Sequence, residues 1–288
     1  MAALETAAEI EIPRTAPTRS LGWVFWLAVA WIVLVLFGAL AADLLPLGDP
    51  AKISLLQRRQ PPSALHLFGT DHLGRDVLTR VVYGTRASLS VGLISAFLGL
   101  LVGGALGLLA GYFRGRLETL TMATMDVLLA FPPIVLALAI IAYLGQSLVN
   151  LTLTLALLSV PAATRVARAA TLAFSAREFV LAARALGASH VRVMLRELLP
   201  NVLLPLGVYS LIVVAVLIVG EGLLSFLGLG VPPPMPSWGS MMSEGREQLD
   251  VAPHIAFIPA IAMFFTVLAF NLVGDRLRAL TDPRRAAS

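Results

Sequence analysis

The sequence predicts an all-α integral membrane protein with six transmembrane helices. Of its 288 residues, 58% are hydrophobic and only 13% are charged, which is too little charge to cover the surface of a soluble domain. The hydrophobic residues also fall in long, nearly uncharged blocks, each close to the roughly 20 residues that a helix needs to cross a hydrocarbon core of about 30 Å. These blocks are expected to be helical because an open strand in lipid leaves backbone groups without hydrogen bonds.

The six predicted spans follow from where these blocks begin and end. The first block carries three tryptophans, and the second is rich in glycine, which lets helices approach closely in lipid. The third and fourth spans come from one block whose only charge is Asp126, divided by the polar residues Gly145, Gln146 and Ser147. The predicted ranges are 20–43, 87–113, two helices within 119–164, 198–220 and 251–274.

The distribution of basic residues predicts the orientation in the membrane. With the N-terminus in the cytoplasm, the cytoplasmic segments hold 14 of the 21 basic residues and the opposite side holds 7. Cytoplasmic loops carry the excess of arginine and lysine in multi-pass proteins, so both termini are expected in the cytoplasm. The predicted organisation is a cytoplasmic tail at 1–19, the first helix at 20–43, an extracytoplasmic loop at 44–86, a five-helix core at 87–278 and a cytoplasmic tail at 279–288.

Composition excludes several functions. The chain has no cysteine, so thiol catalysis and cysteine-bound zinc are ruled out. Lys52 is the only lysine and does not follow a glycine, so no Walker A loop is present and any ATP hydrolysis belongs to another chain. The four histidines lack metal-ligand spacing. No metal or cofactor is expected on this chain, and the net charge of +4 reflects membrane orientation rather than nucleic-acid binding.

The segment 175–199 is predicted to form two short helices on the cytoplasmic side. Ser175 and Glu178 have the spacing of a capping box, Gly187 suits the position just after a helix, and Ser189 can cap the next one. The segment presents small and apolar side chains ringed by arginines. This pattern alone fits an interfacial amphipathic helix lying on lipid as well as a docking site for a cytosolic partner.

The same segment resembles the cytoplasmic coupling loop of binding-protein-dependent ABC importer permeases. That family's pattern is Glu-Ala-Ala, three residues, Gly, nine residues and then Ile-x-Leu-Pro. Here Ala182 and Ala183 precede Gly187 and Pro200 at the family spacing, with Leu181 in place of the first Glu and Glu197 in place of Ile. The resemblance implies that an ATPase contacts this segment through Glu178, Phe179, Leu181, Ala182, Ala183, Arg184, Leu186, Gly187, Ala188 and Ser189.

Four further segments are similar to the peptide and nickel branch of that family. They are 68–80 with its continuation at 84–89, 221–230, 237–239 and 271–275, and the similarity extends over about 68–283. A single span ahead of a long outer loop resembles the C-type half of the dipeptide and oligopeptide permease pair. The outer-loop motif consists of Gly69, Thr70, Asp71, Gly74, Arg75 and Asp76.

The resemblance implies a type I ABC importer permease in a bacterial cytoplasmic membrane. Its expected partners are a second homologous permease, two ATPase subunits or domains that bind ATP and magnesium, and an extracytoplasmic substrate-binding protein that delivers di- or oligopeptides. The leading alternative is a secondary transporter or channel without an ATPase. It would favour charges at the membrane centre and paired broken helices, and neither is evident in the sequence. An intramembrane hydrolase would need a nucleophile and a base within the spans, which are also lacking.

Two carboxylates in or beside the spans are candidates for a gate or path, because ionisable groups in a membrane are functional candidates by default. Asp126 is expected in the first turns of the third span, paired with an arginine such as Arg116. Glu221 is expected at the outer end of the fifth span, where it is solvated or caps a neighbouring helix.

Overall fold

The computed structural model describes residues 21–281, and the regular structure of this range is helical. Five helices are long and apolar enough to cross a membrane, and the number is six when the pair α3 and α4, bent by 84°, counts as one span. The predicted all-helical fold with six spans is therefore confirmed. The helices are α1 Gly22–Ala41, α2 Val77–Phe113, α3 Gly115–Leu129, α4 Pro133–Leu144, α5 Leu148–Ser175, α6 Glu178–Ala185, α7 His190–Arg192, α8 Leu199–Phe226, α9 Trp238–Arg246 and α10 His254–Thr281.

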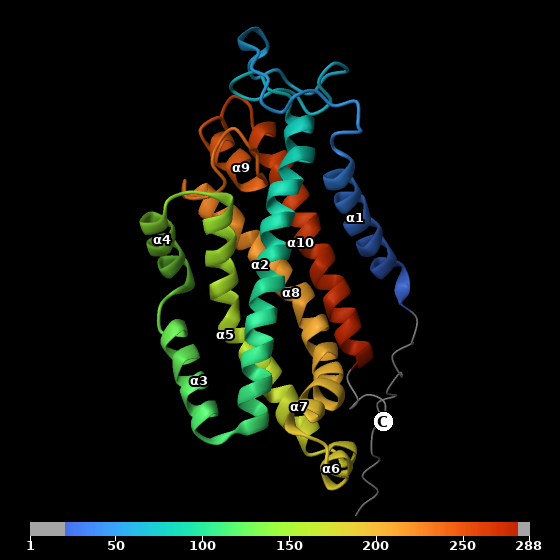
Figure 1. Cartoon of the computed structure of the whole chain (residues 1–288). Coiled ribbons are helices and arrows are strands. Elements are labelled where there is room, and N and C mark those ends of the chain that lie inside the picture. Colours follow the sequence, from blue (N-terminus) through green and yellow to red (C-terminus); the bar gives the residue numbers. More distant parts are fainter. Residues whose placement is uncertain (1–20, 282–288) are drawn as a thin grey trace, which may run out of the picture.

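The helices form a bundle around α2, which runs almost its full length (Figure 1). Helices α5 and α8 pack on α2, and α1 and α10 lie on one side of the bundle while α3 and α4 lie on the other. One end of the bundle carries α9 and the loop 42–76, and the opposite end carries α6 and α7. These ends are called the α9 end and the α6 end below.

Helix α2 begins at Val77, ten residues earlier than the predicted start at 87, so the predicted loop 44–86 ends at 76. Asp76 caps the helix by accepting a hydrogen bond from the backbone N–H of Thr79. The first turns contain Arg80 and Arg86. Because the span was predicted from uncharged residues alone, these two charges placed its predicted start too late. Helix α5 likewise continues to Ser175, beyond the predicted limit at 164, and includes Arg165 and Arg168.

The predicted third span is broken into α3 and α4, which the sequence analysis did not predict. Pro132 caps α4 and Pro133 is its first residue. Proline lacks a backbone N–H and disfavours a helical conformation in the residue before it, so the helix stops after Leu129 and restarts at an angle of 84°.

Glycine allows the close approach of α2 and α5. A Cβ atom added at Gly103 would lie 2.7 Å from the carbonyl oxygen of Val160 and the same distance from the Cβ of Ala163. Gly99, Gly107 and Gly111 face α5 in the same way. Small residues at such spacing let two helix backbones meet without side chains between them, so α2 and α5 form one rigid pair.

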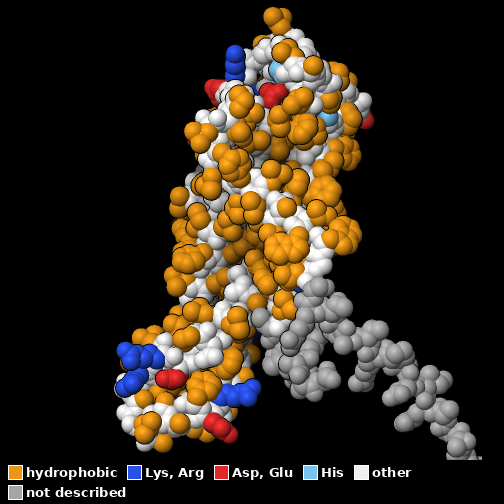
Figure 2. Space-filling model, turned by 90° about the vertical axis from the view of Figure 1, so that its right-hand side faces the viewer, with side chains coloured by type: hydrophobic (Ala, Val, Ile, Leu, Met, Phe, Trp, Pro, Cys, Tyr) orange, Lys and Arg blue, Asp and Glu red, His pale blue; other side chains and the backbone are white. Residues whose placement is uncertain are grey.

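Helices α1 and α10 form a face suited to lipid. In Figure 2 the middle of this face is covered by hydrophobic side chains, and charged side chains gather only near the two ends. Both helices carry exposed large hydrophobic side chains, among them Trp23, Trp26, Leu34, Phe37, Phe257, Phe264 and Leu268. Helix α1 alone has 20 residues, about 30 Å, which is the thickness of the hydrocarbon region of a bilayer.

Candidate functional site

Helix α6 ends at Ala185 with Leu186 as its C-cap, and Gly187 follows in the terminating position that the sequence predicts. This glycine has φ +81°, its N–H donates to the carbonyl of Arg184, and the N–H of Ala188 donates to the carbonyl of Ala183, both at 3.0 Å. This pair of bonds is the Schellman motif, which requires the left-handed conformation that glycine adopts without strain. Ser189 then caps α7 by accepting from the N–H of Arg192, as predicted.

The predicted capping box of Ser175 and Glu178 is wrong. Ser175 is the last residue of α5, and its hydroxyl donates to the carbonyl of Thr171 at 2.6 Å. The residue that caps α6 is Arg177, whose side chain makes no cap hydrogen bond. Serine near a helix end often donates back to the carbonyl four residues earlier, and that bond replaces the predicted one here.

Helix α6 projects from the end of the bundle (Figure 1), and several of its apolar side chains are exposed. Val180 is fully buried and anchors α6 in a hydrophobic cluster with Leu198 and Val202. Leu186 is 88% exposed, and Phe179 and Leu181 are also exposed. The remaining residues of the predicted coupling segment form the rest of this surface, with Glu178, Ala182, Arg184, Gly187 and Ser189 exposed and Ala183 and Ala188 half-buried. Exposed leucines on an anchored helix are a surface that a partner can cover.

Tyr112, at the end of α2, joins α2 to this segment, and sequence analysis did not identify it. Its hydroxyl lies 2.8 Å from Nδ1 of His190, and the guanidinium of Arg184 lies 4.9 Å from the centre of its ring. An arginine over an aromatic face at this distance is a cation–π contact. Tyr112 therefore links α2 to both α6 and α7. No spacing in the sequence indicates this contact, because 72 residues separate Tyr112 from Arg184.

At the α9 end, the predicted outer-loop motif forms a buried network of ion pairs. Asp71 accepts hydrogen bonds from Arg75 at 2.5 Å and from Arg80 at 2.7 Å. Glu244 of α9 binds the same two arginines, at 2.6 and 3.1 Å. The network ties the loop to α2 and α9. Glu244 is the member that sequence analysis did not include.

The other motif residues shape the loop around this network. Gly69 and Gly74 have φ of +74° and +77°, Thr70 forms a short antiparallel bridge with Asp76, and Asp76 caps α2. Positive φ favours glycine, and a Cβ at Gly69 would also lie 2.5 Å from the carbonyl oxygen of Gln60. The motif is thus a folded cap over the end of α2.

Glu244 has an unusual environment. Burial raises its pKa, and the positive charge of the neighbouring Arg75 opposes this rise. Asp71, His72 and Glu244 lie close enough together for a metal ion, but the two carboxylates already bind Arg75 and Arg80. The cluster therefore has the chemistry of a structural ion-pair network rather than of a metal site.

Glu221 is fully buried in α8, so the expectation that it is solvated is wrong. Its carboxylate accepts a hydrogen bond from the hydroxyl of Ser88 at 2.9 Å and from that of Ser225 at 2.6 Å. The Ser88 hydroxyl also accepts from the backbone N–H of Trp238 at 3.1 Å. Glu221 thus connects α8 to α2 and, through Ser88, to the start of α9.

Asp126 lies in the last turn of α3 and forms an ion pair with Arg165 of α5 at 2.6 Å. The predicted pairing with an arginine is confirmed, but the arginine is Arg165 and not Arg116: α3 begins at Gly115, so Arg116 lies almost three helical turns away along the same helix. Arg165 was placed in a loop by the sequence analysis, whereas the structure places it inside α5.

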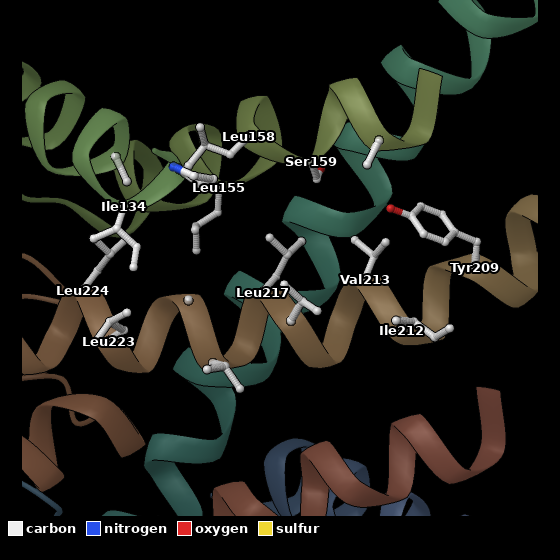
Figure 3. Close-up of a pocket in the computed structure, with 16 residues that line it drawn as sticks. Ile134, Leu155, Leu158, Ser159, Tyr209, Ile212, Val213, Leu217, Leu223 and Leu224 are labelled. Atoms are coloured by element: carbon white, nitrogen blue, oxygen red, sulfur yellow. The ribbon is translucent and has the colours of Figure 1, made fainter. Parts of the chain in front are cut away.

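A cavity of about 380 Å³ lies between α4, α5 and α8 (Figure 3). Its walls are apolar, with Ile134 from α4, Leu155 and Leu158 from α5, and Val213 and Leu217 from α8. The volume falls in the usual range of small-molecule sites, roughly 300–1,000 Å³. Sequence analysis did not identify this cavity, because its residues read only as parts of membrane spans.

The sequence was compared with protein families and with individual proteins, and it matches one family. Residues 103–287 match the family described as binding-protein-dependent transport system inner membrane component. A glutathione transport system permease protein of Pectobacterium atrosepticum is 42% identical over 223 residues, which are 77% of this chain and 74% of the relative. A putative peptide transport system permease protein of Brucella suis is 42% identical over 260 residues, which are 90% of this chain and 88% of the relative.

Solved structures give the same fold. The inward-facing MetNI methionine ABC transporter aligns with a TM-score of 0.59 and 21% identity, over 70% of this chain and 97% of the other. An amino acid ABC transporter aligns with a TM-score of 0.52 and 16% identity, over 69% of this chain and 92% of the other.

The helical fold, the projecting α6 and these relatives define a multi-pass membrane permease with the type I ABC importer fold, not an enzyme. The chain belongs to the binding-protein-dependent transport system inner membrane component family. It is a permease subunit of an ABC importer in the bacterial inner membrane.

Proposed function

We propose that this chain forms one half of a permease pair that imports di- or oligopeptides delivered by an extracytoplasmic binding protein. The observation that carries the substrate class is the similarity to permeases named for glutathione, which is itself a tripeptide, and for peptides. The second half is expected to be a homologous permease, and the substrate passes between the two.

Helix α6 is the proposed contact with the ATPase. Val180 fixes it to the bundle while Leu181 and Leu186 face outward, and the Schellman motif at Gly187 holds the turn that follows. A partner helix or cleft would cover these leucines. Two ATPase subunits or domains are expected, one for each permease, and they would bind ATP and magnesium. This chain would hold neither.

The α6 end is proposed to face the cytoplasm. It carries Arg114, Arg116, Arg177, Arg184, Arg192 and Arg196, which belong to the segments that together hold 14 of the 21 basic residues of the sequence. Such an excess of basic residues is typical of the cytoplasmic side. The α9 end, with the folded motif at 69–76, would then receive the binding protein. The predicted tail at 1–19 and residues 282–288 lie outside the described residues.

The proposed mechanism is a rigid-body one. Closure of the two ATPases around ATP would move α6, and Tyr112 would pass this movement to α2, with which α5 packs rigidly through its glycine contacts. Interfaces between packed helices switch between discrete arrangements rather than deforming smoothly. The path would thereby open on one side as it closes on the other.

The direct test is to purify the chain from its native membrane in a mild detergent and to identify what accompanies it. An ATPase and a second permease are expected, and the complex should import peptides into proteoliposomes only when ATP and the binding protein are supplied. A chain that purifies alone and transports without ATP would favour the alternative of a secondary transporter or channel.

A further inference from the structure

An exposed ion pair, Asp126 with Arg165, lies on the side of the bundle, about three helical turns from the α6 ends of its two helices. Asp126 is 11 residues from the start of α3 at Gly115, and Arg165 is 10 residues from the end of α5 at Ser175. At a rise of 1.5 Å per residue these positions are about 16 Å and 15 Å from the α6 ends of their helices. Helix α5 has 28 residues and is about 42 Å long, so a hydrocarbon core of roughly 30 Å centred on this helix would include Arg165.

These charges are not enclosed by this chain. The side chains of Asp126 and Arg165 are 63% and 52% exposed. An ionisable side chain at such a depth is costly in lipid, and in membrane proteins it faces a protein interior or a water-filled cavity. The lipid-like face formed by α1 and α10 carries its charged side chains only near its ends (Figure 2). Asp126 and Arg165 therefore mark a different kind of surface.

The break between α3 and α4 supports the same conclusion independently. It lies at residues 130–132, four residues beyond Asp126, and Phe131 is exposed beside it. A break of 84° leaves backbone groups without helical partners, and lipid cannot satisfy them. Irregular backbone at membrane depth is tolerated only where it meets protein or water.

The ion pair continues one wall of the cavity between α4, α5 and α8. Leu158 and Ala162 of α5 line this cavity, and Arg165 follows them at helical spacing on the same face. Tyr209 of α8 also lines the cavity, with its hydroxyl directed into the space between α8 and α5 (Figure 3). This hydroxyl makes no hydrogen bond with the part of the chain that the structure describes.

We propose that Asp126, Arg165 and Tyr209 form the polar end of this cavity and bind the charged groups of a peptide during its passage. The inference deepens the proposed function and rests on it. Asp126 offers an acceptor for an ammonium group, and Arg165 and Tyr209 offer donors for a carboxylate. The apolar walls accept uncharged side chains. Because the two charges already neutralise each other, the site holds a zwitterionic peptide weakly, which suits a passage site.

The test measures charge selectivity. The complete complex is reconstituted with its binding protein and ATPases, and ATP-driven uptake of the tripeptides Ala-Glu-Ala and Ala-Lys-Ala is measured. In Asp126→Asn the charge of Arg165 is uncompensated, so the uptake ratio of acidic to basic peptide should rise. In Arg165→Gln the ratio should fall. A change of about fivefold in each direction corresponds to one unpaired charge near hydrated groups.

A matched control is available in the ion pair between Asp43 and Arg86, at 2.8 Å, where Asp43 is 67% exposed just after α1. Asp43→Asn should leave the ratio unchanged. Because all variants share one binding protein, its preferences cancel when each ratio is divided by that of the wild type. The melting temperature and yield of each purified complex are measured as well, so that loss of folding is recognised separately from a change in selectivity.

Opposite shifts in the two variants support the inference. Equal losses for both peptides, or unchanged ratios, would overturn it and assign the ion pair to a contact with the second permease. If the wild-type complex contains its ATPases but accumulates neither tripeptide, the peptide assignment itself fails. That outcome is distinct from wild-type uptake with unaltered selectivity.

Discussion

The hydroxyl of Tyr112 lies 2.8 Å from Nδ1 of His190, and this contact joins the end of α2 to the segment that follows α6. Helix α2 reaches from the ion-pair network at Arg80 to this contact. Movement of α6 would therefore be transmitted to the opposite end of the bundle by one continuous helix. The first prediction follows from this relationship.

Tyr112→Ala should uncouple ATP hydrolysis from transport. The variant loses both the hydrogen bond to His190 and the ring under Arg184, so α6 would move without α2. We expect the number of ATP molecules hydrolysed per peptide imported to rise severalfold. Tyr112→Phe keeps the ring and should have a smaller effect. A ratio of hydrolysis to transport that is unchanged in both variants would contradict this role.

Gly187→Leu should impair transport while leaving the chain in the membrane. Gly187 has φ +81° with open space around it, so the cost arises from the backbone conformation, about 1–2 kcal/mol for an ordinary residue. Gly187→Asn should retain more uptake because asparagine tolerates this conformation. Gly207→Ala is the matched control, since Gly207 has open space and no positive φ. Uptake by Gly187→Leu equal to that of the wild type would refute the prediction.

Gly103→Leu should destabilise the bundle. The added side chain would meet the backbone of α5 at Val160, and overpacking of this kind costs typically about 1–3 kcal/mol or more. The melting temperature of the detergent-purified complex should fall clearly. Gly38→Leu adds the same side chain to α1, where nothing lies within 4 Å, and should have little effect. Equal melting temperatures for the two variants would argue against close packing of α2 and α5.

Water should reach the cavity between α4, α5 and α8. The chain contains no cysteine, so any labelling of this chain by a thiol reagent occurs at the single cysteine that is introduced. A membrane-impermeant thiol reagent should label Ala162→Cys, which lines the cavity, during ATP-driven turnover. It should not label Phe264→Cys on α10, since Phe264 is an exposed apolar residue of a helix that is expected to face lipid. Labelling of position 264 but not of 162 would reverse the assignment of the two faces.

Sequence patterns located the membrane spans because hydrophobicity is a property of each block by itself. Gly187 and Ser189 were also predicted correctly, since helix ends depend on local conformational preferences. The start of α2 was missed because Arg80 is neutralised by Asp71 and Glu244. The last of these residues is 164 positions away, and sequence spacing carries no sign of such a pair.

The candidate sites could be predicted only for segments that resemble the sequence motifs of the family. It indicated the α6 segment and the motif at 69–76, but it did not indicate the cavity or the partner of Asp126. The pairing with Arg165 depends on α5 extending past 164, and the two charged residues within that extension made it resemble a loop. Tyr112 and His190 meet only because the chain returns after α6 to the end of α2, where α7 begins.

The central claim is that α6 contacts an ATPase, and the most direct measurement is photo-crosslinking from Leu186 in native membranes. A photoreactive phenylalanine analogue placed at Leu186, which is 88% exposed, should capture an ATPase subunit with high yield. The same analogue at Phe264 should capture lipid. If position 186 captures lipid and no ATPase, α6 is an interfacial helix, and the proposed coupling of ATP hydrolysis to this chain is wrong.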